Sequence, residues 1–396
     1  MCLETITTLS PVTNEPILTR KGVSSEDLRQ KKQDELAREV TEQMGRPIAY
    51  TGVEIMTAIK RGSIPPYLTL VNSLVPAILA GNAVILKPSP QTPTIVEQIT
   101  AAFMEAGLPK DVLQYLHCGS FTLLETLLRS PQINHISFTG SLTGGLAVQK
   151  VASDRIVNVC LELGGKDPAY VRDDVDLAWA AEEIVDGAIF NSGQSCCAIE
   201  RVYVHERIHN AFIAEIKKVL SQYRVGDPSD PKTQIGPVIS KQSKETIQTQ
   251  VEDAIKKGAK DETPENDTFK NFPPNGNYVK PTLLTGVSHK MSVMTKETFG
   301  PVIPVMKVSG DDEAVRWMND SEFGLTASVW TKDVSAAEKL IERVEAGTVF
   351  VNRSDFPSPD LAWTGWKNSG RGVALSRFGF EQFVKLKSYH IKDYPR

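Results

Sequence analysis

Cys196 stands in a sequence context that suits a nucleophile. It follows a turn-forming stretch, Asn191–Gln194, in which Gly193 allows a tight backbone path. A thiolate attacks carbonyl carbons, and a helix N-terminus or a polar surrounding lowers the thiol pKa from its free value of about 8.5. Free cysteines are usually buried and unreactive, so Cys196 taken alone also fits a structural thiol, which is the commoner case.

Glu162 is the candidate general base. Its carboxyl group lies between two leucines and directly before Gly164 and Gly165, in the segment Leu161–Lys166. At the end of a strand, desolvation would raise its pKa toward the range in which a base accepts a proton near neutral pH. An ordinary carboxylate at a sheet edge would give the same sequence pattern.

Two further segments combine glycines with polar or aromatic residues. Phe138–Gly145 follows an apolar strand, and glycines at the start of a helix let backbone N–H groups approach a pyrophosphate. Its spacing differs from the G-x-G-x-x-G fingerprint, so a tight strand-to-helix turn explains it equally well. Lys296–Val302 alone indicates only a turn before a strand. The histidines form no H-E-x-x-H pair and the cysteines no paired C-x-x-C spacing, which predicts no metal site.

The elements that must position these residues alternate between strands and helices. Short apolar runs predict buried parallel strands over 83–86, 112–116 and 135–138, with a helix beginning at Thr94. This alternation predicts an α/β fold with a parallel sheet, whose carboxyl-end loops form the ligand-binding edge. A second α/β block begins near Lys166. Its predicted helices cover 177–189 and 209–220, and its predicted strands cover 202–205, 326–330 and 348–351.

Composition narrows the classes of function. The 396 residues correspond to two or three domains, at about 150 residues per domain. With 44 basic and 48 acidic residues the net charge is −4, which does not favour a nucleic-acid partner. The apolar run 68–86 is interrupted by Pro76 and Gly81, which predicts a buried helix, turn and strand and no membrane span. Five cysteines and no evident targeting segment predict a reducing, cytoplasmic location.

Taken together, six segments resemble the aldehyde dehydrogenase superfamily and occur in the order typical of it. Glu162 precedes Cys196 by 34 residues (196 − 162), a spacing that fits this family. The resemblance covers 66–396 well and 25–60 weakly. The six segments are Lys87–Ser89 with Pro93, Phe138–Ser141, Glu162–Lys166, Gly193–Cys196, Glu297–Pro301 and Lys367–Gly370.

The resemblance implies a fold and an assembly. A Rossmann-like coenzyme-binding domain is expected over 1–165, completed by 373–383, with an α/β catalytic domain over 166–372. A short oligomerisation tail is expected over 384–396, because the residues from 385 to 391 alternate like an edge strand and resemble the part that pairs between subunits in relatives. The expected assembly is a homodimer or homotetramer.

The resemblance also implies the chemistry. Cys196 would attack a small-molecule aldehyde to give a thiohemiacetal, a hydride would pass to NAD or NADP, and Glu162 would activate the water that releases the carboxylic acid. The Arg201, Arg353 and Arg371 side chains are candidates for meeting an acidic aldehyde, although surface arginines are commoner. The expected coenzyme-binding residues are Lys87, Ser89, Gly140, Ser141, Gly145, Glu297 and Phe299. Asn352 is expected on the substrate side.

Three departures from the family bear on activity. Ile64 occupies the position of an asparagine that supplies half of the oxyanion hole in relatives, and loss of one such donor typically costs about 10²–10³ in rate. The chain is short near residues 60–65, where relatives have further strands, so the coenzyme sheet is expected to present an unpaired edge. Pro90 replaces a carboxylate that would select NAD, so NADP stays open.

These departures leave two alternatives to an active dehydrogenase. One is a catalytically impaired relative that binds nucleotide or pairs with homologues. The other is a thiol hydrolase that uses Cys196 on esters without a coenzyme.

Overall fold

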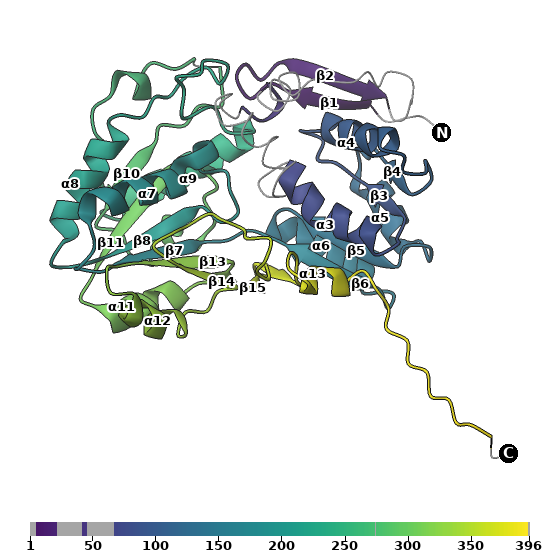
Figure 1. The fold of residues 1–396 in the computed structure, drawn as a ribbon. Helices are drawn as coiled ribbons and strands as arrows, with labels where there is room; N and C mark the ends of the chain where they lie inside the picture. The colour runs from purple at the N-terminus through teal and green to yellow at the C-terminus, as the bar shows by residue number, and fades with distance from the viewer. Residues whose placement is uncertain (1–4, 22–41, 46–66, 274, 395–396) are drawn as a thin grey trace.

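The computed structural model describes residues 5–21, 42–45, 67–273 and 275–394, arranged in two α/β halves (Figure 1). The larger half, which we call the catalytic half, is built on a seven-stranded sheet of order β14-β13-β7-β8-β11-β10-β9. Six of the strands run parallel, and only β9 is antiparallel to its neighbour. The strands are β7 (Asp167–Val171), β8 (Ile199–His205), β9 (Lys260–Asp261), β10 (Thr282–Thr285), β11 (Val302–Val308), β13 (Thr326–Trp330) and β14 (Thr348–Val351).

Helices cover both faces of this sheet because successive strand residues point to opposite sides. Val202 and Val204 pack with α7 and α8 in one core cluster, whereas Tyr203 between them packs with α9, α11 and α12 in another. Both faces are therefore apolar, as expected for central parallel strands. The helices are α7 (Leu177–Ile189), α8 (His209–Leu220), α9 (Lys241–Lys256), α10 (Ser292–Thr295), α11 (Asp311–Asn319) and α12 (Val334–Ile341).

The smaller half, which we call the coenzyme half, contains two separate sheets. One pairs β3 (Val84–Leu86) with β4 (Leu113–Tyr115), and the other joins β5 (His135–Thr139), β6 (Asn158–Glu162) and β16 (Gly370–Arg371). Within the described ranges, no ladder connects the two sheets. The predicted unpaired edge in this half is thus consistent with the structure. The helices are α3 (Tyr67–Leu79), α4 (Thr94–Glu105), α5 (Phe121–Arg129), α6 (Leu142–Ala152) and α13 (Phe378–Glu381).

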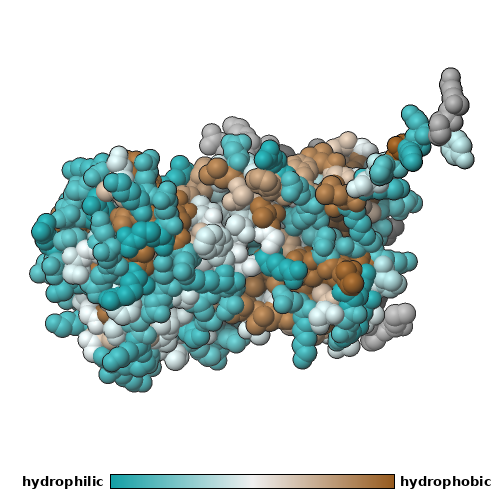
Figure 2. All heavy atoms as spheres, turned by 90° about the horizontal axis from the view of Figure 1, so that it is seen from below, coloured by the Kyte–Doolittle hydropathy of each residue, from teal (hydrophilic) through white to brown (hydrophobic). Residues whose placement is uncertain are grey.

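The surface differs between the halves. Figure 2 shows apolar side chains gathered over the coenzyme half, whereas the catalytic half is mostly hydrophilic in that view. The apolar residues exposed in the coenzyme half include Leu79, Ile85, Phe121, Leu146 and Phe378. The chain then ends in an extended segment that projects from the body (Figure 1).

The remaining elements are short. A hairpin of β1 (Thr5–Leu9) and β2 (Pro16–Lys21) lies near the N-terminus, and β12 (Phe323–Gly324) pairs with β15 (Trp366–Lys367). Two 3₁₀ turns are η1 (Phe190–Gly193) and η2 (Asp267–Phe269). No helix of the described residues combines the length and apolarity needed to cross a membrane.

The predicted α/β fold is confirmed. The strands over 326–330 and 348–351 and the helices over 177–189 and 209–220 have the predicted bounds, and the other predicted strands differ only at their ends. The domain boundaries stay predictions. Ile64 and the short region near 60–65 lie outside the described residues.

Candidate active site

Three predicted segments meet at the amino edge of the seven-stranded sheet. Gly164 and Gly165 precede β7, Cys196 precedes β8, and Glu297–Pro301 precedes β11. Because β7, β8 and β11 are parallel neighbours, the loops before them lie side by side. The segment at Gly164 and Gly165 and the segment Glu297–Pro301, which are more than a hundred residues apart in the sequence, therefore lie at the same edge of the sheet.

Glycines allow these loops to touch. A Cβ on Gly193 would collide with the backbone of Gly300, and one on Gly164 would collide with the Glu297 carboxylate. A Cβ on Gly165 would crowd the carbonyl oxygen of Cys196. These three glycines, from two motifs, are therefore required by the close approach of the chain.

The loop before Cys196 has an unusual backbone. Asn191, Ser192 and Gly193 all have left-handed φ angles, of 53°, 60° and 72°. For the two non-glycine residues this conformation costs of order 1–3 kcal/mol each. Buried hydrogen bonds hold it: Asn191 Nδ2 donates to the carbonyl of Gln194 at 2.9 Å, and Ser192 Oγ donates to the carbonyl of Gly236 at 2.9 Å.

Cys196 itself is half-buried at the end of this loop. It packs against an apolar cluster of Cys197, Leu325, Trp363 and Ala374. The thiol is thus positioned between a hydrogen-bonded polar loop and an apolar cluster, and it is partly accessible to solvent.

Glu162 reaches the same wall from the end of β6. The indole of Trp363, which belongs to the cluster that contacts Cys196, also hydrogen-bonds the Glu162 carboxylate. Burial raises the pKa of Glu162 to about 8, and the Trp363 bond opposes that shift in part. A carboxyl group with a raised pKa is suited to accept a proton near neutral pH. The structure therefore brings the predicted base to Trp363, a member of the apolar cluster against which the predicted nucleophile packs.

Glu297 lies across the same edge. The N–H of Gly165 donates to Glu297 Oε1 at 3.1 Å. Burial raises the pKa of Glu297 to about 7, with the nearby Glu200 adding to the rise. Two residues on, Phe299 keeps a third of its surface exposed and has a left-handed φ of 49°. Contact of either side chain with a coenzyme stays a prediction.

A buried polar network behind Glu297 was not predicted. Lys166 Nζ lies 2.7 Å from Glu200 Oε2 and donates to Thr298 Oγ1 at 2.8 Å. The N–H groups of Thr298 and Phe299 donate to the two oxygens of Glu200 at 2.8 and 2.7 Å. Lys166 and Glu200 are at most 5% exposed, so the pair fixes the backbone that carries Glu297 and Phe299. One signal for this network was present in the sequence: Lys166 and Glu200 are charged residues beside or within apolar strands.

The other predicted coenzyme residues lie at the carboxyl edge of the coenzyme half. Lys87 and Ser89 follow β3, and Gly140 and Ser141 follow β5; all four are exposed. Ser141 caps α6, accepting from the N–H of Gly144 at 3.2 Å. The open start of this helix suits the phosphates of a dinucleotide.

Gly145 differs from these residues because it is buried. A side chain there would collide with Leu163, so this glycine permits close packing of α6 on the segment after β6. Its part in coenzyme binding is therefore through the position of the helix.

One expectation about the substrate side, that of Arg201, is wrong, whereas the place of Asn352 on that side stays a prediction. Arg201 is 1% exposed, and its Nε donates to the carbonyl of Lys166 at 2.7 Å, so it is a structural residue that meets no acidic aldehyde. The amide of Asn352 bonds the backbone of Thr331 in both directions, at 2.9 and 2.8 Å. Arg353 stacks on the ring of Phe356.

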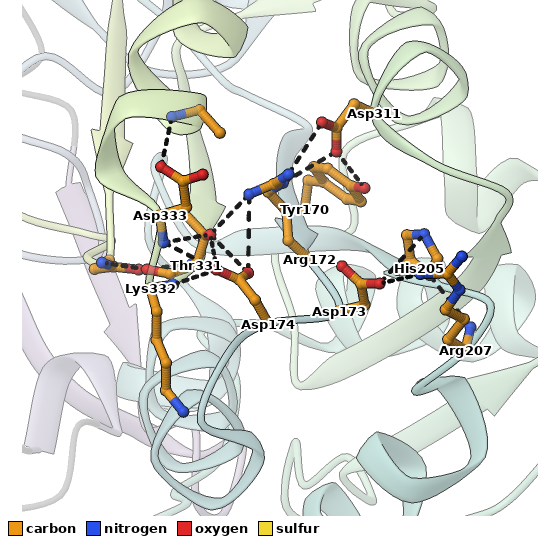
Figure 3. A network of polar contacts seen from close by, with 12 residues as sticks. Tyr170, Arg172, Asp173, Asp174, His205, Arg207, Asp311, Thr331, Lys332 and Asp333 are labelled. Atoms are coloured by element: carbon orange, nitrogen blue, oxygen red, sulfur yellow. Dashed lines mark hydrogen bonds and ion pairs between the residues drawn. The ribbon is translucent and has the colours of Figure 1, made fainter.

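A second polar region lies at the opposite, carboxyl edge of the seven-stranded sheet (Figure 3). Its charges are already paired: Arg172 Nε donates to Asp311 Oδ1 at 3.1 Å, and Thr331 Oγ1 donates to Asp174 at 2.7 Å. This hollow of about 760 Å³ is a self-neutralised surface, remote from Cys196.

The fold and the site define an α/β protein in which a half-buried thiol and a buried carboxyl group lie beside a half whose exposed helix start suits a dinucleotide. The family model described as "Aldehyde dehydrogenase family" matches residues 65–389. The chain is 33% identical to lactaldehyde dehydrogenase of Escherichia coli over 331 residues, which are 83% of this chain and 68% of the relative. It is 32% identical to betaine aldehyde dehydrogenase of Bacillus subtilis over 334 residues, which are 83% and 67% of the two chains.

A solved structure of an NAD-dependent aldehyde dehydrogenase from Sinorhizobium meliloti has a TM-score of 0.89 at 27% identity, covering 99% of this chain and 93% of that chain. The chain therefore belongs to the aldehyde dehydrogenase family. The predicted class, an aldehyde-oxidising enzyme that uses NAD or NADP, is confirmed with it. These relatives give no support to the catalytically impaired alternative.

Proposed function

We propose that Cys196 is the nucleophile and Glu162 the general base in the oxidation of a small aldehyde to its carboxylic acid. The observation that supports the proposal is that both residues meet one apolar cluster: Cys196 packs against it, and Glu162 contacts its member Trp363. The edge that holds Cys196 also holds Glu297. The chain matches about two thirds of the length of its curated relatives. Aldehyde oxidation by the full chain is therefore the activity that the experiment below tests.

The proposed reaction has two stages. The Cys196 sulfur bonds the aldehyde carbon, and the carbonyl oxygen becomes the oxygen of a thiohemiacetal. A bound NAD or NADP would supply the acceptor for the hydride of this carbon. Loss of that hydride, and of the hydroxyl proton to solvent, leaves a thioester on Cys196. Glu162 then takes a proton from water, the hydroxide attacks the thioester, and the acid leaves while the Cys196 sulfur is restored.

The coenzyme-binding residues share the remaining work in this proposal. Glu297 accepts hydrogen bonds from ribose hydroxyls, and Phe299 packs beside the nicotinamide. The start of α6, with Gly140 and Ser141, holds the pyrophosphate, while Lys87 and Ser89 meet the adenosine ribose. Pro90 provides no carboxylate to repel a 2′-phosphate, so we expect both NAD and NADP to be accepted.

The deciding experiment compares two adjacent thiols. Purified Cys196→Ala and Cys197→Ala proteins are assayed for aldehyde-dependent formation of NADH or NADPH. We expect the first to be inactive and the second to keep measurable turnover. Equal rates for Cys196→Ala and the unchanged protein would refute the mechanism. Ester cleavage that persists without coenzyme, in the absence of aldehyde oxidation, would support the hydrolase alternative instead.

We also propose that the chain forms a homodimer or homotetramer in the cytoplasm. In the C-terminal tail, Leu386, Ile391 and Tyr394 are more than 80% exposed, and apolar residues of this size are normally covered. Edge strand β14 has a single neighbour among the described strands, which would let it accept a partner's tail. Light scattering of the full chain and of a chain ending at residue 383 tests this: only the first should be larger than a monomer. The free thiols favour a reducing compartment.

A further inference from the structure

The active-site loop contains two adjacent cysteines in very different surroundings. Cys196 is half-buried, whereas Cys197 is 3% exposed and is enclosed by Leu325, Trp363 and Ala374. Adjacent thiols have similar intrinsic reactivity, so an enzyme that needs only one of them must suppress the other.

A single carboxylate holds both neighbours of Cys196. Cys197 Sγ donates to Asp355 Oδ1 at 2.8 Å, and Ser195 Oγ donates to the same oxygen at 3.1 Å. Asp355 comes from the segment after β14, so the nucleophile loop is tied to a different part of the chain. Its backbone φ of 49° is left-handed, a conformation that aspartate adopts more readily than most other residues.

The charge around the Cys197 thiol has one sign. Asp355 and the Cys196 thiol are the titratable groups that face it, and its other packed neighbours, Leu325, Trp363 and Ala374, are uncharged. The hydrogen bond to Cys196, burial and the Asp355 charge all raise the pKa of Cys197. The proton therefore stays on this sulfur, and it is shared with the carboxylate through the hydrogen bond.

We infer that Asp355 is a positioning residue that assigns the two thiols their roles. Its carboxylate keeps Cys197 as a neutral hydrogen-bond donor and fixes the residues on both sides of Cys196, which leaves Cys196 as the reactive sulfur. The inference rests on the proposed function, in which Cys196 is the nucleophile. It adds that a carboxylate from the segment after β14 contributes to the selection of one sulfur over the other.

Alkylation of the full chain tests the inference directly. The protein is treated with iodoacetamide from about pH 6 to about pH 9, a range that spans the titration of an ordinary thiol, and each cysteine is quantified by peptide mass spectrometry. In the unchanged protein we expect alkylation at Cys196 and protection of Cys197. In Asp355→Asn we expect Cys197 to react at least about tenfold faster, with a rate that rises with pH as for a free thiol.

The choice of variant separates charge from packing. Asparagine keeps an acceptor oxygen for Ser195 and Cys197 but removes the negative charge, whereas Asp355→Ala removes both. Asp360→Asn, at an exposed position of the same segment, is the matched control and should behave as the unchanged protein. Continued protection of buried Cys160 shows that each variant is folded.

Two results would overturn the inference. One is protection of Cys197 in both Asp355 variants. The other is reaction of Cys197 in Asp355→Ala alone, which would make the carboxylate only a packing group. We further expect kcat of Asp355→Ala to fall about tenfold with little change in KM, because in this variant the loop loses its tether. The proposed function is tested by a separate measurement: it would be refuted if Cys196→Ala oxidised aldehyde as fast as the unchanged protein.

Discussion

The two halves of the molecule are held together to very different degrees. In the catalytic half one continuous sheet of seven strands has apolar cores on both faces. In the coenzyme half two small sheets are linked by side contacts, such as Ser73 Oγ to Ser137 Oγ at 3.1 Å. Cys196 is therefore carried by one continuous, well-packed sheet. The predicted coenzyme-binding residues are carried by a half with unpaired strand edges and exposed apolar side chains.

Among these predictions, replacing the buried Lys166 should cause the largest loss of stability, and it concerns the catalytic half. Removing one partner of a buried ion pair leaves the other charge unpaired, at a cost of about 3–5 kcal/mol. We expect Lys166→Ala to lower the free energy of unfolding by this amount. Urea denaturation followed by tryptophan fluorescence measures it. An effect under about 1 kcal/mol, the value for exposed pairs, would mean that the pair does not support this edge.

A core deletion in the coenzyme half should leave the other half unaffected. All five tryptophans lie between residues 179 and 366, so their fluorescence reports on the catalytic half. Leu113→Ala removes a fully buried side chain next to β3, at a cost of about 2–5 kcal/mol. We expect an early transition in circular dichroism, with no shift in the tryptophan transition. One coincident transition by both probes would show that the halves unfold together.

The Glu162 carboxyl group should give the site its pH dependence. Since the base must be ionised, turnover should fall about tenfold for each pH unit below its pKa, which is about 8. Glu162→Gln should abolish this profile along with most turnover. A profile that is flat between pH 6 and 8 in the unchanged protein would exclude Glu162 as the base.

The same group predicts a stability profile. Its folded pKa of about 8 lies above its ordinary value of 4.5. Between these values the folded state holds a proton that the unfolded state releases, so the stabilisation is complete below 4.5 and is lost as the pH rises through 8. Urea midpoints measured across this window should decline with pH, and the decline should be smaller in Glu162→Gln.

The smallest effect is expected at the carboxyl edge of the seven-stranded sheet. Arg343 pairs with Asp312 at 2.8 Å on an exposed surface. Such pairs contribute about 0–1 kcal/mol, so Arg343→Ala should leave both stability and turnover nearly unchanged. A large loss of turnover would show that this surface affects the reaction at Cys196.

Much of this organisation could be predicted from the sequence. Apolar runs predicted the strands over 326–330 and 348–351, and the order of six motifs predicted the family. The features that could not be predicted depend on contacts between segments that are far apart in the sequence. The left-handed Asn191 and Ser192, the Lys166–Glu200 pair and the Asp355 tether all arise where such segments meet, and no local pattern specifies their partners. The separation of the coenzyme half into two sheets likewise depends on which strands find neighbours.

Glu162 belongs to both halves at once. Its backbone carbonyl accepts the N–H of Gly140 at 3.0 Å and its residue pairs with Gly370, while its side chain extends to Trp363. A small rotation of one half against the other would thus tilt the carboxylate relative to the sulfur.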